Sequence, residues 1–265
     1  AMRGEVRAMN AVDHLKVLAD CLEASDSAAG QNALFTLHAS EMDYEMKFFA
    51  ERGETPTSYL KKIGAVNERL LAGHCIHLTA EDIAMLAEGN AAIAHCIGSN
   101  TQAGKGVAPM AAAARAGVRF GLGTDGPSSG NTLSLFDQMR LFADAHKTAN
   151  RDRALFPAKE IVRAATRGGA QALHAGNELG QLRPGLRADM VLVSVDAPHM
   201  FPVYNPYSAL VYGANSSDVS LVMASGEVLV RGGKLTRLDM EEAKAKLLEQ
   251  MGPFMQSAAK YADII

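Results

Sequence analysis

Four short apolar runs between residues 33 and 125 constrain this chain most, because each ends in a polar residue and is followed by a helical pattern. The runs cover residues 33–38, 70–74, 91–95 and 118–125, and they end at His38, His74, His95 and Asp125. This alternation predicts parallel strands connected by helices, and near-continuous apolar strands indicate a sheet covered on both faces. Because the carboxyl ends of parallel strands meet at one edge, we expect these four polar residues to share a site.

Helix signals separate the runs. Thr79 and Asp82 form a capping box that predicts a helix start, with Ile83, Leu86 and Ala87 on one face. Helical periodicity also covers residues 109–116, 133–146 and 157–173. Before the first strand, apolar residues at helical spacing predict an amphipathic helix that packs on the sheet, at Val12, Leu15, Leu18 and Leu22.

The pattern changes near residue 176, where a turn-rich segment leads into a small all-β region. A strand is predicted over residues 190–195, followed by a hairpin of residues 219–223 and 228–230 around the Ser225-Gly226 turn. A last helix is predicted over residues 240–251. We therefore expect three parts, at residues 1–175, 176–237 and 238–265.

Charge and composition restrict the partners. With 26 Lys and Arg against 29 Asp and Glu, the net charge is -3, which argues against nucleic acid or an anionic membrane as a partner. No run approaches the roughly 18 apolar residues of a membrane span, and the first thirty residues lack a signal-peptide core. Three cysteines in no zinc or redox spacing indicate reduced thiols. We expect a cytoplasmic protein with a small-molecule partner.

The polar strand ends also resemble a known family. The residues that carry the likeness are His38-Ala39-Ser40-Glu41, Gly73-His74-Cys75-Ile76-His77-Leu78, Ala94-His95-Cys96 with Ser99-Asn100, Gly123-Thr124-Asp125-Gly126, and the tail Gly180-x-Leu182-x-x-Gly185-x-x-Ala188-Asp189. They resemble the successive motifs of the amidohydrolase superfamily. The likeness is closest to 5-methylthioadenosine/S-adenosylhomocysteine deaminases and triazine chlorohydrolases, and it runs from about residue 33 to 237.

The resemblance implies a fold and a set of roles. The family has a (β/α)8 barrel of the TIM type beside a small β-sandwich, and it holds a divalent metal by an H-x-H pair, a fifth-strand His and an eighth-strand Asp. By position, His38 and Asp125 would be ligands of zinc, with iron or manganese as alternatives. Glu41 would handle protons on a ring nitrogen, His74 would polarise the water, and Asp125 would take its proton. Substrate contacts would come from Ser129, His95 and Asn100.

Together these roles imply a metal-dependent deaminase of a purine-like heterocycle, such as S-adenosylhomocysteine or 5-methylthioadenosine. The alternatives are an amino- or chlorohydrolase of guanine, a pterin or a triazine, or a metal-free relative that acts as a scaffold. Two residues have a structural reading as well, since Glu41 would suit the first turn of a helix and Ser129 an ordinary turn. We expect His77 not to be a ligand, and His14, His146, His174 and His199 to be structural or exposed.

The departures from the family are as informative as the likeness. The chain has no H-x-H, and only four of eight barrel strands are predicted. It thus corresponds to the second half of a barrel, as a fragment, a shortened non-catalytic relative, or a half completed by another chain. Because two sheet edges would be unpaired, we expect self-association or a completing partner. Metal binding by this chain alone is expected to be weak or absent.

Two other enzyme classes fit less well. A cytidine-deaminase type of zinc site needs H-x-E with P-C-x-x-C, and the sequence has neither. The dinucleotide-binding spacing at Gly121, Gly123 and Gly126 runs through a strand end and contains Asp125, unlike a Rossmann turn.

Overall fold

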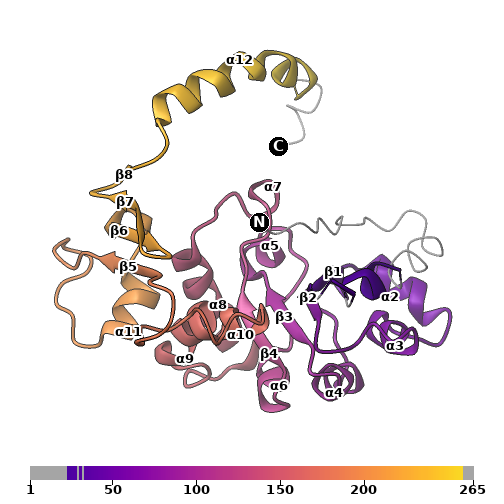
Figure 1. The fold of residues 1–265 in the computed structure, drawn as a ribbon. Coiled ribbons are helices and arrows are strands. Elements are labelled where there is room, and N and C mark those ends of the chain that lie inside the picture. The colour runs from indigo at the N-terminus through magenta and orange to yellow at the C-terminus, as the bar shows by residue number, and fades with distance from the viewer. Residues whose placement is uncertain (1–22, 29, 32, 259–265) are drawn as a thin grey trace. The chain divides into compact units, whose positions relative to one another are not determined.

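The computed structural model describes residues 23–28, 30–31 and 33–258, so the amphipathic helix predicted from Val12 to Leu22 lies outside the described residues. Figure 1 shows the course of the chain. Contacts divide it into two units. The first holds the chain up to Leu186 together with Val195–Ser216, and the second holds Arg187–Ser194 together with the chain from Ser217 onward.

The first unit is built on a parallel sheet of four strands. They are β1 (Phe35–Ala39), β2 (Leu70–His74), β3 (Ala92–His95) and β4 (Arg119–Leu122), paired in chain order. The register sets Ala39 beside His74 and His95 beside Leu122, so the carboxyl ends of the strands lie level with one another. In the part of the chain that the structure describes, β1 and β4 each pair on one side. The four predicted strands are thus confirmed.

Helices follow each strand of this sheet. They are α2 (Asp43–Ala50), α3 (Pro56–Lys62), α4 (Ala80–Glu88), α5 (Ile97–Gln102), α6 (Met110–Arg115), α7 (Pro127–Gly130), α8 (Leu135–Asn150), α9 (Ala158–Arg163), the π-helix η1 (Ala164–Gly168) and α10 (Gly169–Ala172). Thr79 caps α4 as predicted, since its side chain accepts a hydrogen bond from the Asp82 N–H at 3.1 Å. The predicted helix 157–173 is present, but it contains a π turn between α9 and α10. A short α11 (Pro206–Ser208) and π-helix η2 (Ala209–Gly213) complete this unit.

The core lies between the sheet and its helices. Phe35, Leu70 and Ile93 from the strands are buried together with Phe142 of α8 and Ile161 of α9. Burying a side chain of this size stabilises the fold by about 1.5–3 kcal/mol relative to exposure. This packing fixes the strand ends, and with them the residues that follow each strand.

The run α9–η1–α10 packs on β4 with almost no space between the backbones. A Cβ added at Gly121 of β4 would lie 2.6 Å from Gly169 Cα, and one added at Gly168 would lie 2.8 Å from the Phe120 carbonyl oxygen. The glycines therefore let helix and strand approach closely, next to the strand that leads to Asp125.

Gly121→Ala is expected to destabilise the chain by about 2–3 kcal/mol, because the new methyl group meets backbone that cannot rotate away. Urea unfolding measures this change. Gly169→Ala on the facing helix is the matched control, since its Cβ would meet only the Ala164 oxygen at 3.7 Å. The control is expected to be neutral or slightly stabilising. Equal free energies of unfolding for the two variants would show that Gly121 has room for a methyl group beside Gly169.

The second unit is an antiparallel sheet of β5 (Met190–Val193), β6 (Val219–Ala224), β7 (Glu227–Arg231) and β8 (Lys234–Leu235), followed by α12 (Met240–Ala258). The 3-10 helix η3 (Ser216–Asp218) precedes β6. Asp189, at the end of the tail motif, accepts a hydrogen bond from the Ser225 N–H at 2.6 Å and so anchors the predicted hairpin turn. Among the described residues, no helix is long and apolar enough to cross a membrane.

Candidate active site

The backbone is strained where three of the parallel strands end. Ser40, His74, Cys75 and Asp125 have φ values between 51° and 64°, in the left-handed region. L residues in this region cost about 1–3 kcal/mol, and such residues gather at functional sites. The Cys75 N–H donates to the Ala39 oxygen at 3.1 Å and the Ile76 N–H to the Ser40 oxygen at 2.9 Å, which holds the turn after β2 in place.

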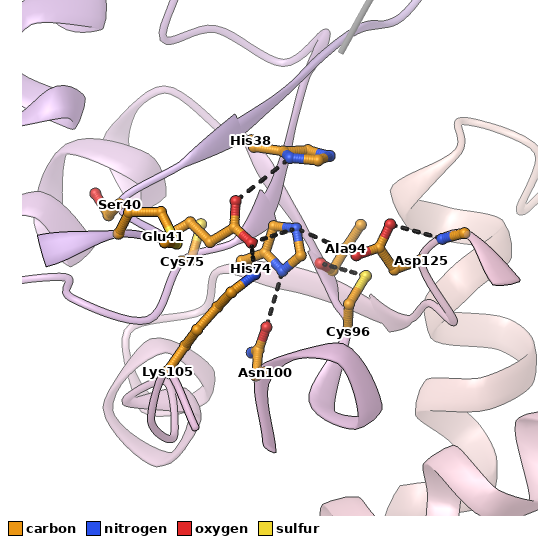
Figure 2. Close-up of polar contacts among 12 residues, drawn as sticks. His38, Ser40, Glu41, His74, Cys75, Ala94, Cys96, Asn100, Lys105 and Asp125 are labelled. Atoms are coloured by element: carbon orange, nitrogen blue, oxygen red, sulfur yellow. Dashed lines mark hydrogen bonds and ion pairs between the residues drawn. The ribbon is translucent and has the colours of Figure 1, made fainter. Parts of the chain in front are cut away.

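Glu41 follows β1 and lies between two imidazoles. Its Oε2 is 3.4 Å from His38 Nδ1, and its Oε1 is 3.5 Å from His74 Nε2 (Figure 2). Ligand atoms of His38, Glu41 and His74 all lie within 4.8 Å of one another. Helix α2 begins only at Asp43, so Glu41 stands outside it and the reading of Glu41 as a first-turn residue is wrong.

Asp125 completes the cluster from β4. Its Oδ2 lies 3.8 Å from His74 Nε2, and its Oδ1 accepts a hydrogen bond from the Gly126 N–H at 2.6 Å. Burial acts to raise the pKa of Asp125, but this hydrogen bond and the nearby histidines lower it overall. The structure thus brings together His38, Glu41, His74 and Asp125, as their positions at the strand ends predict.

Asn100 of α5 contacts His74 at Nδ1, the ring nitrogen away from Glu41 and Asp125. Its Oδ1 lies 2.8 Å from His74 Nδ1, and the Nε2 of His74 faces Glu41 and Asp125. Both side chains are buried, and burial lowers the pKa of His74. A neutral imidazole with a free Nε2 suits metal ligation or proton transfer. Asn100 therefore lies against a predicted catalytic residue.

Glu41 itself is ionised. Its burial acts to raise the pKa, but hydrogen bonds from His38 and from Lys105, whose Nζ lies 2.5 Å from Glu41 Oε1, lower it to about 2. Glu41 in turn raises the pKa of His38. The site therefore presents carboxylates at neutral pH.

The donor set fits a divalent metal. Two imidazoles and two carboxylates are the groups that zinc prefers in catalytic sites. Several polar atoms around this site are buried without a hydrogen-bond partner, among them Ser40 Oγ and Asn100 Nδ2. Such atoms are expected where a ligand or water completes the hydrogen bonding.

His95 is not brought to this cluster, and its predicted substrate contact is corrected. Its side chain is fully buried, and its Nε2 lies 2.9 Å from the Nε2 of His146 on α8. Aromatic rings of Phe142 and Phe156 surround the pair. His95 points into the packing of α8, although it lies level with His74 in the neighbouring strand. The apolar spacing of Met139, Phe142 and His146 on α8 is the signal that indicates this buried face.

The buried pair predicts a loss of stability in acid. Burial lowers the pKa of His95 to about 3 and that of His146 to about 4. The unfolded chain binds these protons below pH about 6.5, whereas the folded chain does not, so stability is complete above that pH and falls as pH decreases toward 4. Each histidine is expected to cost about 2 kcal/mol at pH 5.

Urea unfolding at pH 7 and pH 5 measures this loss. The double variant His95→Asn/His146→Phe lacks both titrating groups and is expected to lose about 4 kcal/mol less than the wild-type chain over this interval. Parallel losses in the two proteins would mean that the pair does not govern acid stability.

The remaining predicted residues are placed as follows. Ser129 lies in α7, four residues after Asp125, and is partly buried, so it is helical rather than part of an open turn. His77 lies outside the cluster, with its Nε2 3.5 Å from Asp43 Oδ1. His174 Nε2 contacts the Glu68 oxygen at 2.7 Å, His199 Nε2 lies 3.2 Å from Asn215 Nδ2, and His14 lies outside the described residues.

Sequence reasoning missed two charged residues at the site. One is Lys105, in the loop after α5, whose flanking glycines at 104 and 106 are the signal of a sharp turn. The other is Glu45 of α2, whose carboxylate accepts hydrogen bonds from the N–H groups of Ser40 and Glu41 at 3.0 and 2.9 Å. Its position three residues after Met42, before a helical run, is that of a capping-box acid.

Comparisons with known proteins agree with this geometry. The model of the amidohydrolase family matches residues 14–229. The chain is 37% identical to a 5-methylthioadenosine/S-adenosylhomocysteine deaminase of Moorella thermoacetica over 86% of its own length and 53% of that protein. It is 36% identical to the protein of the same name from Pyrococcus abyssi, over 87% of this chain and 54% of that one.

Solved structures give the same result. An adenosine deaminase from Xanthomonas campestris with bound zinc superposes with a TM-score of 0.84 and 31% identity, covering 88% of this chain and 53% of that one. The zinc complex of an atrazine chlorohydrolase from Arthrobacter aurescens TC1 gives a TM-score of 0.77 and 31% identity, covering 85% and 50%.

These matches confirm the predicted fold class, an α/β fold of the TIM-barrel type with part of the barrel and a separate antiparallel sheet. The chain spans about half the length of the curated relatives it matches. Family model, relatives and strand-end residues all agree: the chain belongs to the amidohydrolase family.

Proposed function

We propose that the protein is a metal-dependent hydrolytic deaminase of a purine-like heterocycle, with an adenosine derivative such as S-adenosylhomocysteine or 5-methylthioadenosine as substrate. The observation that carries the proposal is the position of the Glu41 carboxylate between His38 and His74, beside Asp125 at the same sheet edge. The names of the relatives support the substrate class.

His38 and Asp125 are proposed to hold the metal, with zinc as the ion, because the neighbouring structures contain zinc. When bound, the metal supplies a Lewis acid that activates water near neutral pH. His74, neutral and held by Asn100, directs its Nε2 lone pair at the same place and polarises that water.

The proton transfers fall to the two carboxylates. Asp125 takes the proton of the attacking water. Glu41 is ionised at rest, so it must first accept a proton before it can pass one to the ring nitrogen. Asp125 then returns its proton to the amine, the carbon–nitrogen bond breaks and ammonia leaves. The ring carbon keeps the oxygen of water, and the hydroxyl proton returns to Glu41. Ser129, in α7 after Asp125, remains the proposed substrate contact of this loop.

The proposed partner is a small heterocycle in the cytoplasm, and the unpaired edges of β1 and β4 favour a second copy or a chain that completes the barrel.

A second candidate function is removal of chloride or an amine from a triazine. The likeness to the zinc-bound atrazine chlorohydrolase favours it. A metal-free scaffold is the third reading, and stoichiometric metal in the purified protein would exclude it.

The test is a substrate panel on a form of the protein in which the barrel is complete. Ammonia release is measured with S-adenosylhomocysteine, 5-methylthioadenosine, adenosine and guanine, and chloride release with atrazine. We expect the highest kcat/KM for one of the adenosine derivatives. Faster turnover of guanine or of the triazine would overturn the substrate assignment, and failure on all five with metal bound would overturn the proposed reaction.

A further inference from the structure

Lys105 makes the shortest contact in the cluster, and the proposed mechanism gives it no role. Its Nζ lies 2.5 Å from Glu41 Oε1, although the two residues are 64 positions apart in sequence. The side chains are 22% and 12% exposed, so this pair is not a solvated surface bridge (Figure 2). A short hydrogen bond between two charged groups that are partly buried is strong, so it holds the two side chains together.

The loop that carries Lys105 is shaped to direct it at Glu41. Gly104 and Gly106 both have positive φ, at 64° and 117°, so the chain turns sharply on each side of the lysine. The Lys105 N–H donates to the Asn100 oxygen at 2.9 Å, which ties the loop to the end of α5. A Cβ on Gly106 would lie 3.2 Å from Ile76 Cγ2, so the loop packs against the segment after His74.

Glu41 is also well placed to bind a metal. Its two oxygens lie 3.4 and 3.5 Å from the nitrogens of His38 and His74, and the three residues form one compact donor group. A carboxylate that coordinates the metal has lost the freedom to carry protons to a substrate. Lys105 competes for the same oxygen, Oε1, that faces His74.

We propose that Lys105 is a positioning residue, which holds the Glu41 carboxylate away from the metal and so leaves it free for proton transfer. The inference rests on the proposed metal site of His38 and Asp125, with His74 beside it. It assigns the two carboxylates to different tasks, Asp125 to the metal and Glu41 to protons, and it names the contact that keeps them apart.

The experiment measures Co²⁺ binding to the 265-residue chain by its visible absorption, which reports both affinity and the number of ligands. Lys105→Met frees Glu41 and is expected to raise the Co²⁺ association constant about tenfold, with a changed spectrum. Lys105→Arg restores the ion pair and is expected to match the wild-type chain. Lys61→Met is the matched control, since it breaks the 2.6 Å pair with Glu88 on the exposed surface.

A variant at Glu41 separates this effect from simple charge. Removing any cation near a metal site favours metal binding, so Lys105→Met is repeated with Glu41→Gln present. We expect the tenfold gain and the spectral change to vanish there. A gain that persists in the double variant, or no gain in Lys105→Met, would overturn the proposal.

The design also covers weak binding by the wild-type chain. If its Co²⁺ binding is weak, both proteins are titrated to saturation at higher Co²⁺ concentration, and a ratio of association constants near one would count against the proposal. Ammonia release is not measured, so a wrong substrate assignment leaves this test unaffected.

Discussion

Glu41→Gln is expected to lower kcat for ammonia release by about 10²- to 10⁴-fold in a form of the enzyme with a complete barrel, the usual range for a general acid or base. The amide keeps the size of the side chain but can no longer accept and return a proton. Because Asp125 and His38 are the proposed ligands, metal content and unfolding free energy are expected to stay unchanged.

Metal analysis by mass spectrometry accompanies the kinetics. Glu88→Gln is the matched control, since it makes the same chemical change on an exposed helix residue. Asp125→Asn is the contrasting variant and is expected to reduce both metal content and turnover, because Asp125 has two proposed roles. Loss of metal from Glu41→Gln would instead make Glu41 a ligand and refute the division of labour.

The isolated 265-residue chain is expected to be inactive and to bind zinc at least about 10²-fold more weakly than a complete barrel. Loss of a residue that merely orients a ligand costs 10- to 100-fold in metal affinity, and here the family's H-x-H pair itself is missing from the chain. His74 cannot replace it without leaving its proposed place beside the water.

Complementation tests this expectation. A separate polypeptide is added that holds the half of the Moorella thermoacetica relative that this chain does not match, where the family pattern places the H-x-H pair. Zinc content after dialysis against a weak chelator is measured together with ammonia release. Both are expected to recover together, because the added half supplies ligands and closing strands at once. The same half with its H-x-H changed to A-x-A controls for docking alone. Stoichiometric zinc and clear turnover in the chain by itself would overturn the expectation.

How far the sequence predicts the site depends on what positions each residue. His38, His74 and Asp125 follow apolar strands, and strand ends in a parallel sheet converge whatever the loops do. His95 ends its strand level with His74 and still points elsewhere, because its ring packs with His146 and Phe142 of α8. Its partner His146 lies 51 residues away, beyond the reach of any local pattern.

The contact of Lys105 with Glu41 could not be predicted from the sequence for a different reason. Its approach to Glu41 depends on two positive φ values and on the docking of the loop against Ile76. Glycines in the sequence indicate a turn, but they do not indicate the direction in which the chain turns. The π turn within residues 164–168 is likewise not indicated by the sequence, whose pattern predicts one helix over residues 157–173.

The Glu45 carboxylate has a consequence for selectivity. Consecutive backbone N–H groups in a tight loop form a receptor for phosphate in many nucleotide-binding proteins. In the loop after β1, these groups at Ser40 and Glu41 are already saturated by Glu45. A phosphorylated ligand that approached this loop would meet internal negative charge instead of donors. The N–H groups of Ser40 and Glu41 are therefore not free to bind a phosphate group.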